Sequence, residues 1–347
     1  MNILIIGNGF DRANKLPTRY SDFLQICKLI RETKVKYNEL DLTFYSITEE
    51  EKTLLTSFYV IGEKHFIEFS SIAKNNLFIE HFLIREKVLG DKWLNFEEEI
   101  EFFINTVIDG MHNSSDETVT TSKITALNNY LNNYSLMGKI TYKDLFLRIK
   151  QEHENLTKLL EIYMDGYINK LSPTPIAGFK KGFYDYCLSF NYTSTYENYY
   201  EKTNSCYIHG KANLNRNNRC DMVLGFDNRF KYSDLSELEM LPYEKFFQRL
   251  ELGTSNDYMT WLKNMDRDGQ NTVDIYGHSL ARADADILEK FITRTNTTTR
   301  IYYCDQLDYF DKLKNLTMIL GADRTIEMVG GLKPVIHFLP INEYTAA

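Results

Sequence analysis

The chain has 347 residues, which at about 150 residues per domain predicts two domains or one elaborated domain. Its 43% hydrophobic and 25% charged residues match ordinary globular usage and exclude wholesale disorder, and no apolar run approaches the roughly 18 residues of a membrane span. With 40 Lys and Arg against 48 Asp and Glu, the net charge of −8 excludes the whole-molecule positive field that drives non-specific binding to DNA or RNA.

The first predicted element is a buried strand over 2–6, an apolar run that ends at Gly7. The segment before Gly7 has no basic region and is too short for a secretory signal peptide, so we expect a cytoplasmic protein. After a polar loop, apolar residues recur at helical spacing between Tyr20 and Ile30. A strand, a glycine loop and a helix in this order are the opening of an α/β fold.

From about 35 to 175 the pattern changes to amphipathic helices. Stretches with a 3.6-residue periodicity and charged faces are 50–71, 75–89, 93–110 and 141–171. The polar stretch 113–123, rich in Ser, Thr and Asp, is predicted to be a loop. We interpret 35–175 as a large inserted helical subdomain.

Strand signals return after Pro173 and Pro175. Short β-prone runs, most of them ending at a polar residue or glycine, are 184–190, 206–208, 222–224, 273–276, 300–303 and 333–338. Helices are predicted from about 284 to 294 and from the end of 300–303 to about Leu320. This alternation predicts a Rossmann-like α/β core over 1–34 and 176–347, with a mostly parallel sheet flanked by helices.

Polar residues collect just after four of these predicted strands. The four segments are Gly7-Asn8-Gly9-Phe10-Asp11, Ser189-Phe190-Asn191-Tyr192-Thr193, His209-Gly210-Lys211 and Gly277-His278-Ser279-Leu280. Because ligands of open parallel sheets bind outside the carboxyl ends of the strands, we expect the functional site at this edge.

Gly7 and Gly9 permit a tight turn and a close approach of backbone N–H groups to a phosphate. Arg12 stands where the G-x-G-x-x-G fingerprint has its third glycine, so the motif is a weak dinucleotide signal. The alternative is that both glycines serve only the turn.

Asn191, His209 and His278 are the candidate catalytic residues of these loops. The amide of Asn191 can hold a ribose hydroxyl or orient a water, or it can cap the next helix. Each histidine lies next to a glycine, where an imidazole can act as general base or as a hydrogen-bonded turn residue. Glu97, from the helical subdomain, either projects into the cleft or complements the dipole at a helix start.

Metal and nucleophile chemistry have weaker signals. His278 with Asp284 and Asp286 could ligate a metal, but there is no H-E-x-x-H motif. The five cysteines contain no C-x-x-C pair, which argues against a disulfide framework and a zinc ribbon. Ser279 is followed by Leu280 and Ala281, so the segment departs from the G-x-S-x-G motif of α/β-hydrolases.

Taken together, these motifs resemble the AbiH family of bacterial abortive phage infection proteins. The resemblance runs from residue 3 to about 305 and is carried by 3–11, 16–18, 20–24, 93–97, 188–193, 207–210, 224–225, 276–280 and Asp284. It implies a role in antiviral defence.

The same residues are distantly similar to sirtuin-type NAD-binding domains. Gly7-Asn8-Gly9-Phe10-Asp11 followed by Leu16-Pro17 resembles their glycine loop, Asn191 their strand-end Asn, and His209-Gly210 their His-Gly. The resemblance implies that Asn191 positions a water or a ribose hydroxyl and that His209 acts as base. The predicted nucleotide pocket comprises Gly7, Asn8, Gly9, Phe10, Asp11, Pro17, Thr18, Gly210, Gly277, Ser279 and Asp284.

This chain departs from the sirtuin pattern at three positions. Thr193 replaces an Asp, Asp11 replaces a Ser and Lys15 replaces a Gly, and the zinc-binding cysteine quartet is missing. Asp11 adds a negative charge to the loop that would contact the diphosphate of NAD. This charge is consistent with a different nucleotide, with a metal that bridges Asp11 to phosphate, or with loss of NAD binding.

Three functions therefore stay open. The first is a hydrolase of the NAD glycohydrolase type, with NAD or another nucleotide as substrate and a phage-derived trigger protein as partner. The second is a nuclease or phosphodiesterase that uses a divalent metal with Asp11, His209, His278 and Asp284, and acts on nucleic acid. The third is a non-catalytic nucleotide-binding sensor that acts through a protein partner. A homo-oligomer is compatible with each, and no membrane partner is expected.

Overall fold

A computed structural model of the chain describes residues 1–39, 42–43, 45–89, 96–112, 141–177, 179, 182–216, 220–227, 235–254, 256–267 and 269–341. The chain divides into two compact units. The first, here called the sheet unit, comprises Met1–Thr18, Leu171–Lys211 and Arg249–Ala347. The second, here called the helical unit, comprises Arg19–Lys170 and Ala212–Gln248.

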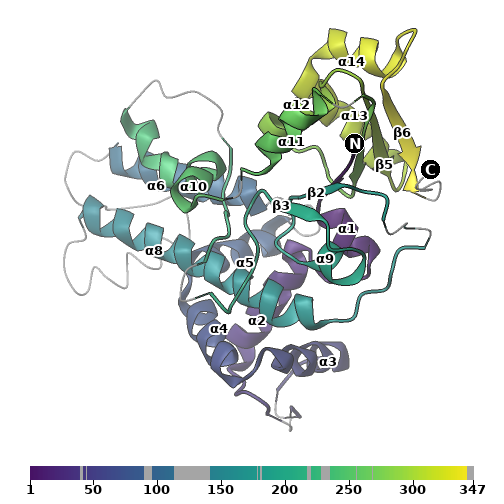
Figure 1. Ribbon diagram of the computed structural model, residues 1–347. Helices are drawn as coiled ribbons and strands as arrows, with labels where there is room; N and C mark the ends of the chain where they lie inside the picture. Colours follow the sequence, from purple (N-terminus) through teal and green to yellow (C-terminus); the bar gives the residue numbers. More distant parts are fainter. Residues whose placement is uncertain are drawn as a thin grey trace. The chain divides into compact units, whose positions relative to one another are not determined.

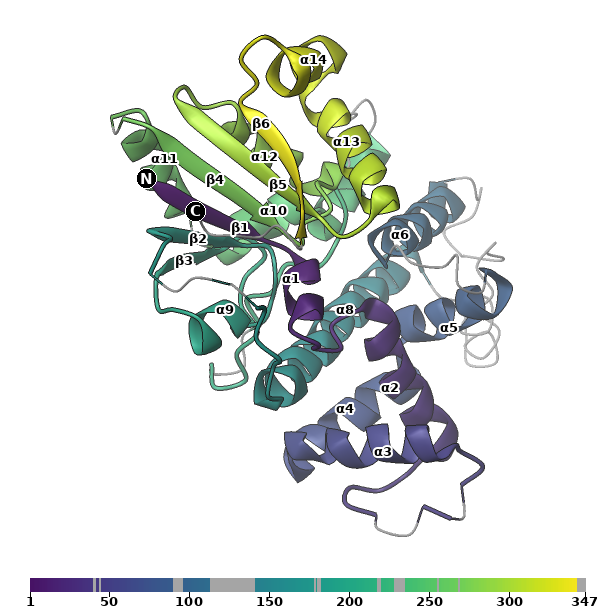
Figure 2. The same cartoon turned by 90° about the vertical axis from the view of Figure 1, so that its right-hand side faces the viewer.

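The sheet unit contains a six-stranded, all-parallel sheet, which confirms the predicted α/β class (Figures 1 and 2). The strands are β1 (Asn2–Ile6), β2 (Tyr186–Ser189), β3 (Asn204–Tyr207), β4 (Asn271–Tyr276), β5 (Thr297–Tyr303) and β6 (Ile336–Pro340). Their order is β3-β2-β1-β4-β5-β6, so β1 lies at the centre. The chain adds β2 and β3 on one side of β1, and then β4, β5 and β6 on the other.

Helices cover both faces of this sheet. Ile3, Ile5 and their neighbours pack against α11 (Tyr258–Met265), α12 (Ala285–Ile292) and α13 (Gln306–Leu320). Leu4 and Ile6 point to the other face, with residues of α1 (Asn8–Ala13) and α9 (Thr195–Tyr199). Since successive residues of a strand face opposite sides, burial on both faces requires the continuous apolar run found in β1. A further helix, α14 (Ala322–Gly330), precedes β6.

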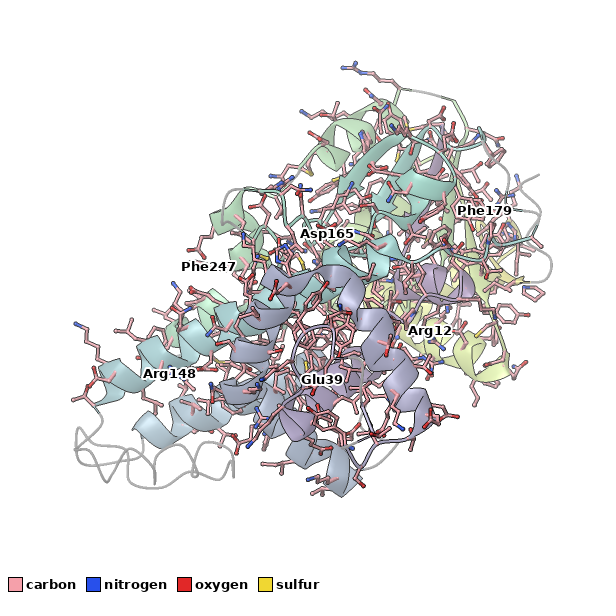
Figure 3. All side chains as sticks on the ribbon, turned by 90° about the horizontal axis from the view of Figure 1, so that it is seen from below. Arg12, Glu39, Arg148, Asp165, Phe179 and Phe247 are labelled. Carbon is pink, nitrogen blue, oxygen red and sulfur yellow. The ribbon has the colours of Figure 1, made fainter. Side chains whose placement is uncertain are left out.

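Two helices of the helical unit begin at a threonine cap. The side chains of Thr48 and Thr141 each accept a backbone N–H from the first turn of a helix. In return, the carboxylate three residues later, Glu51 or Asp144, accepts the backbone N–H of the threonine. Figure 3 shows Arg148 on the second of these helices. The elements are α2 (Tyr20–Thr33), α3 (Glu49–Phe58), η1 (Tyr59–Ile61), α4 (Glu63–Asn75), α5 (Leu77–Leu89), α6 (Phe96–His112), α8 (Tyr142–Glu161), η3 (Ile162–Tyr167), η4 (Ile168–Lys170), η5 (Leu235–Tyr243) and α10 (Lys245–Leu252), the last of which continues into the sheet unit.

Two element predictions are wrong. Residues 222–224 form no strand, because the side chain of Gln248 bonds both the N–H and the carbonyl of Leu224, at 3.0 and 2.8 Å. The predicted helix 50–71 is two helices, α3 and α4, separated by η1 and by Gly62 with φ +86°. Trp93 and the predicted loop 113–123 lie outside the described residues.

The helical unit starts at Arg19 and includes Ala212–Gln248, whereas the predicted insertion runs over 35–175. The predicted domain boundaries stay a proposal. None of the helices in the described ranges is both long and apolar enough to cross a membrane.

Candidate functional site

The loops after β1 and β4 interlock through glycines. Gly7 N–H donates to the carbonyl of Tyr276 at 3.2 Å, and Gly9 N–H donates to the carbonyl of Gly277 at 2.8 Å. A Cβ on Gly9 would lie 2.6 Å from Cα of Gly277, and Gly277 has φ +68°. Close packing of the two loops therefore requires these glycines. The two N–H groups that the sequence offers to a phosphate are already hydrogen-bonded to the neighbouring loop.

Asn191 ties the loop after β2 to the loop after β1. Its Nδ2 donates to the carbonyl of Gly7 at 3.0 Å, and its backbone N–H donates to Oγ of Ser189 at 3.2 Å. The side chain is buried, and α9 begins only at Thr195 after Ser194 as N-cap. Asn191 is thus a tether between two strand-end loops and not a helix cap.

Two histidines and one aspartate meet at the carboxyl ends of β3 and β4. His209 Nε2 lies 2.8 Å from Asp284 Oδ1, and His278 Nε2 lies 3.3 Å from Asp284 Oδ2. All three residues are buried, with 3, 3 and 6% of their surface exposed. Phe190 packs edge-on against both imidazoles, with ring centroids 5.5 Å from His209 and 4.4 Å from His278. The structure therefore brings together three of the residues that the sequence singled out.

The hydrogen bonds of His278 fix its tautomer. Leu280 N–H donates to His278 Nδ1 at 2.9 Å, so Nδ1 is the acceptor and the ring proton of the neutral form is on Nε2, facing Asp284. Leu280 is fully buried and has φ +58°, a left-handed conformation that is uncommon for a bulky residue and that recurs at functional sites. His278 is thereby held rigidly against the carboxylate.

This arrangement favours proton transfer through His209. A carboxylate that accepts from one imidazole nitrogen fixes the ring orientation and stabilises the protonated ring. Both nitrogens of His278 are engaged by Leu280 and Asp284. His209 directs Nε2 to Asp284, so Nδ1 is the atom through which it would exchange a proton with a ligand.

Asp11 is a second buried acid of the same sheet edge. Burial raises its pKa to about 6, against the opposing hydrogen bonds of Thr193 and Thr195. Thr193 Oγ1 donates to Asp11 Oδ2 at 2.6 Å, whereas the buried Oδ1 has no hydrogen-bond partner among the described residues. An unsatisfied buried acceptor is costly, so this atom is suited to a hydroxyl donor.

The remaining predicted pocket residues of the sheet unit have diverse environments. Phe10 is fully buried among aromatic rings, edge-on to Phe179 and Tyr276 at centroid distances of 5.5 and 5.9 Å. Thr18 Oγ1 donates to Asn8 Oδ1 at 2.5 Å, and Asn8 is exposed. Pro17 is partly buried, Gly210 is buried with φ +73°, and Ser279 is exposed.

Glu97 lies in the helical unit, on the first turn of α6. Lys245 Nζ donates to Glu97 Oε1 at 2.6 Å, and Lys245 is 2% exposed. A buried ammonium needs such a counter-charge, so this ion pair by itself accounts for an acid at this position.

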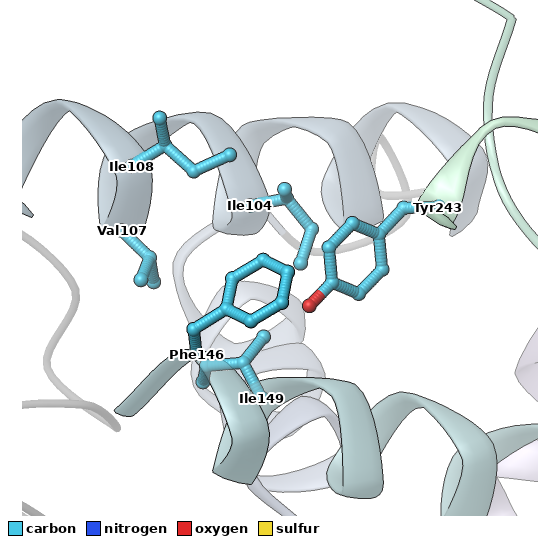
Figure 4. A pocket seen from close by; sticks show the side chains of 6 residues that line it. All are labelled: Ile104, Val107, Ile108, Phe146, Ile149 and Tyr243. Carbon is cyan, nitrogen blue, oxygen red and sulfur yellow. The ribbon is translucent and has the colours of Figure 1, made fainter. Parts of the chain in front are cut away.

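A metal site and a nucleotide-sized pocket are the two other site types that bear on the function. Within the described ranges, no three His, Cys, Asp or Glu side chains form a group that could hold a metal ion. A pocket of the helical unit is lined by Ile104, Val107, Ile108, Phe146, Ile149 and Tyr243 (Figure 4). Its lining is apolar apart from the one hydroxyl of Tyr243, whereas nucleotide sites need several polar groups for the phosphates and the ribose. It does not suit a nucleotide.

The sequence did not predict which residues hold the candidate side chains in place, although Ser189 and Leu280 lie in the strand-end segments named above. Leu280 orients His278, Ser189 orients Asn191, and Thr195 supports the acid at position 11. A left-handed leucine has no sequence signal. The two hydroxyl residues could have been found, because Ser and Thr beside a strand end commonly bond the neighbouring backbone or side chains.

Comparison with known proteins gives one family. A family model described as "Bacteriophage abortive infection AbiH" matches residues 3–305. The matched range includes the loops after β1, β2, β3 and β4, and thus every candidate site residue described above. No curated protein and no solved structure matches the chain.

Proposed function

The chain belongs to the AbiH family of bacteriophage abortive infection proteins, and from that premise we propose that it is a nucleotide-directed hydrolase of the NAD glycohydrolase type. We propose in addition that the sheet unit is a Rossmann-like nucleotide-binding fold. Its strand order β3-β2-β1-β4-β5-β6 is that of the sheets that bind dinucleotides. In such sheets the ligand lies outside the carboxyl ends of the strands, where the strand order reverses. Here that point is between β1 and β4.

The observation that carries the proposal is the buried group of His209, Asp284 and His278 at this edge. A carboxylate between two imidazoles is costly to bury unless the groups are hydrogen-bonded to each other, and it prepares one imidazole to accept a proton. Buried titratable groups at the carboxyl ends of parallel strands are typical of catalytic sites.

The proposed reaction is hydrolysis of the bond between nicotinamide and ribose. The C–N bond breaks with its electron pair passing to nicotinamide, which leaves as a neutral molecule. Water forms the new bond to the anomeric carbon of the ribosyl cation and gives its proton to Nδ1 of His209. The products are nicotinamide, ADP-ribose and one proton. Asp284 stabilises the protonated imidazole, and His278 acts as a positioning residue for Asp284.

The chemistry of Asp11 fits the ribose part of a nucleotide better than its phosphates. A carboxylate repels a diphosphate, whereas an unsatisfied Oδ1 accepts from a hydroxyl. Asn191 lies on the loop that also supplies Thr193, the partner of Asp11. We therefore assign Asp11 to a ribose hydroxyl, and we propose that Asn191, besides tethering its loop to Gly7, positions the attacking water.

The test is nicotinamide release from NAD by the purified full-length chain, with and without a lysate of phage-infected cells. Release by the wild type, loss of release in His209→Ala, and retention in the control His65→Ala would support the proposal. His65 lies on α4 in the helical unit. Intact NAD under both conditions, with His209→Ala still protecting cells from phage, would reject it.

Two further outcomes would also reject it and identify the alternative. EDTA-sensitive cleavage of RNA or DNA would indicate the metal-dependent nuclease. A rise in melting temperature with NAD, without turnover in the presence of lysate, would indicate the nucleotide-binding sensor.

A further inference from the structure

Helix α13 of the sheet unit has large apolar side chains on its exposed face as well as on its buried face. Its inner face is buried at Lys312, Leu316 and Leu320. The outer face exposes Leu307, Phe310 and Met318, with 77, 56 and 56% of their surface accessible. A surface helix usually keeps its outer face polar, so large apolar side chains at this spacing indicate a surface that is covered by a partner.

Two charged residues lie between these apolar side chains. Asp311 and Lys314 are exposed, and neither forms an ion pair with another described residue. Positions 307, 311, 314 and 318 are spaced by four, three and four residues, so they form one stripe along the helix, of the kind used in helix pairing.

The stripe is complementary to itself when its direction is reversed. In an antiparallel pair of identical helices related by a twofold axis, two residues face each other when their numbers have a constant sum. With the axis between 312 and 313, Leu307 faces Met318 of the other copy, and Asp311 faces Lys314 of the other copy. Leu307 thus meets Met318 and Asp311 meets Lys314, each twice per pair, while Phe310 faces Asn315 of the other copy beside this stripe.

We propose that α13 is a self-association surface and that its occupant is α13 of a second copy of this chain, antiparallel to the first. The charges favour a second copy over an unrelated partner. The order of Asp311 and Lys314 makes the stripe complementary to an antiparallel copy of itself, and binding to an unrelated protein would not require this. The surface begins at residue 306, one residue after the family match ends at 305, so the proposal does not depend on the activity proposed above.

A single pair of helices buries less than the roughly 1,200 Å² found in stable protein–protein interfaces. We therefore expect a weak dimer, whose share of the protein rises with the protein concentration. A surface that is exposed in one copy and depends on one stripe is also easy to disrupt without unfolding the protein.

Charge exchange across the stripe tests the proposal by sedimentation of the full-length chain over a wide range of concentrations. Asp311→Lys and Lys314→Asp each place two like-charged pairs in the interface, so each should weaken dimerisation about tenfold or more. The double variant Asp311→Lys/Lys314→Asp restores both pairs and should return the dimer constant to within about threefold of the wild type. Unchanged circular dichroism of each variant would show that it is folded.

The apolar positions give a matched comparison. Leu307→Glu should abolish dimerisation, whereas Leu250→Glu should not, because Leu250 is 73% exposed but lies on α10. A wild type that stays monomeric at all concentrations, a dimer insensitive to both single charge changes, or a double variant as weak as the single ones would overturn the proposal.

Discussion

Both units of the molecule bury carboxylates together with imidazoles, but they do so in different places. In the sheet unit, Asp284 is held between His209 and His278, on loops that follow strands. In the helical unit, Glu99 on α6 lies 3.0 Å from His81 Nε2 and 2.9 Å from Arg85 Nη2, both on α5. The first group lies at the end of a sheet, and the second lies between two helices.

The surroundings of the two groups differ as well. In the helical unit, buried polar groups complete helix ends: Glu152 accepts the N–H of Leu77 at 3.0 Å, at the start of α5. In the sheet unit, a left-handed Leu280 and an unsatisfied oxygen of Asp11 accompany the buried charges. Burial of charge is therefore common to structural and candidate functional groups. Position at the strand ends distinguishes the second kind, because the described part of the helical unit also has buried unsatisfied atoms, among them His153 Nε2 and Tyr243 OH, and a left-handed residue at Lys34.

The largest expected effect is on the rate of nicotinamide release, which should depend on the His209–Asp284 group of the sheet unit and not on the Glu99 group of the helical unit. His209→Gln should lower the rate of nicotinamide release by about 10²–10⁴-fold, since a general base contributes that much, and should also lower the free energy of unfolding, because it weakens the buried pair with Asp284. Glu99→Gln should keep the rate but lower the free energy of unfolding by about 1–3 kcal/mol, because it weakens a buried hydrogen-bonded pair. Rates and urea unfolding of both variants give the comparison. Equal loss of rate in the two variants would remove the distinction.

The second prediction concerns acid stability of the helical unit. Burial lowers the pKa of His153 from 6.5 to about 4, so the unfolded state takes up a proton at higher pH than the folded state. Its contribution to stability is complete above pH 6.5 and falls by about 3 kcal/mol as the pH drops to about 4. His153→Phe should show a flatter loss over this range in chemical unfolding. Parallel curves for wild type and variant would contradict the buried neutral imidazole.

The third prediction has the opposite sign in the sheet unit. Burial raises the pKa of Asp11 from 3.8 to about 6, so the folded state holds its proton longer than the unfolded state. The stability that this group contributes is complete below pH 3.8 and is lost as the pH rises through about 6. Asp11→Asn should therefore gain up to about 3 kcal/mol over the wild type at neutral pH and little at pH 4. A variant less stable than the wild type at neutral pH would argue that the ionised carboxylate is satisfied in the folded protein.

The smallest expected effect is the same in both units and serves as a control. Lys15 and Lys34 have φ of +63 and +54°, one in each unit. Glycine adopts this conformation without a steric penalty, and it loses more chain entropy on folding. Lys15→Gly and Lys34→Gly should each raise the free energy of unfolding by about 0.5–1 kcal/mol. If only one of the two variants were stabilised, the positive φ of the lysine alone would not account for the change in the free energy of unfolding.

The sequence predicts the strands of the sheet because each is a short apolar run that ends at a polar residue or glycine. The runs 2–6, 184–190, 273–276 and 300–303 are confirmed as β1, β2, β4 and β5. The run 222–224 has the same composition, but Gln248 satisfies its backbone instead of a neighbouring strand. An apolar run predicts burial, and only the fold decides which group takes its hydrogen bonds.

The candidate site could be predicted as a set of residues but not as a geometry. His209 and Asp284 are 75 residues apart in the sequence and 2.8 Å apart in the structure, and no spacing rule connects them. In the sequence, Gly7 and Gly9 resemble the glycines of a phosphate-binding loop. In the structure, the loop at Gly277 packs against them, and no sequence pattern shows this contact. Strand-end position was the reliable signal, because it follows from the architecture of parallel sheets.

The central claim, that the nucleotide site is formed by the strand-end loops of the sheet unit, is tested most directly by hydrogen exchange. The measurement compares His209→Ala with and without saturating NAD, because the variant should bind the dinucleotide without consuming it. The account predicts slower exchange in the loops after β1, β2, β3 and β4, at 7–18, 189–195, 208–211 and 277–284, and unchanged exchange in α5, α6 and α8. Protection confined to the helical unit, or no protection in the four loops at saturation, would contradict it.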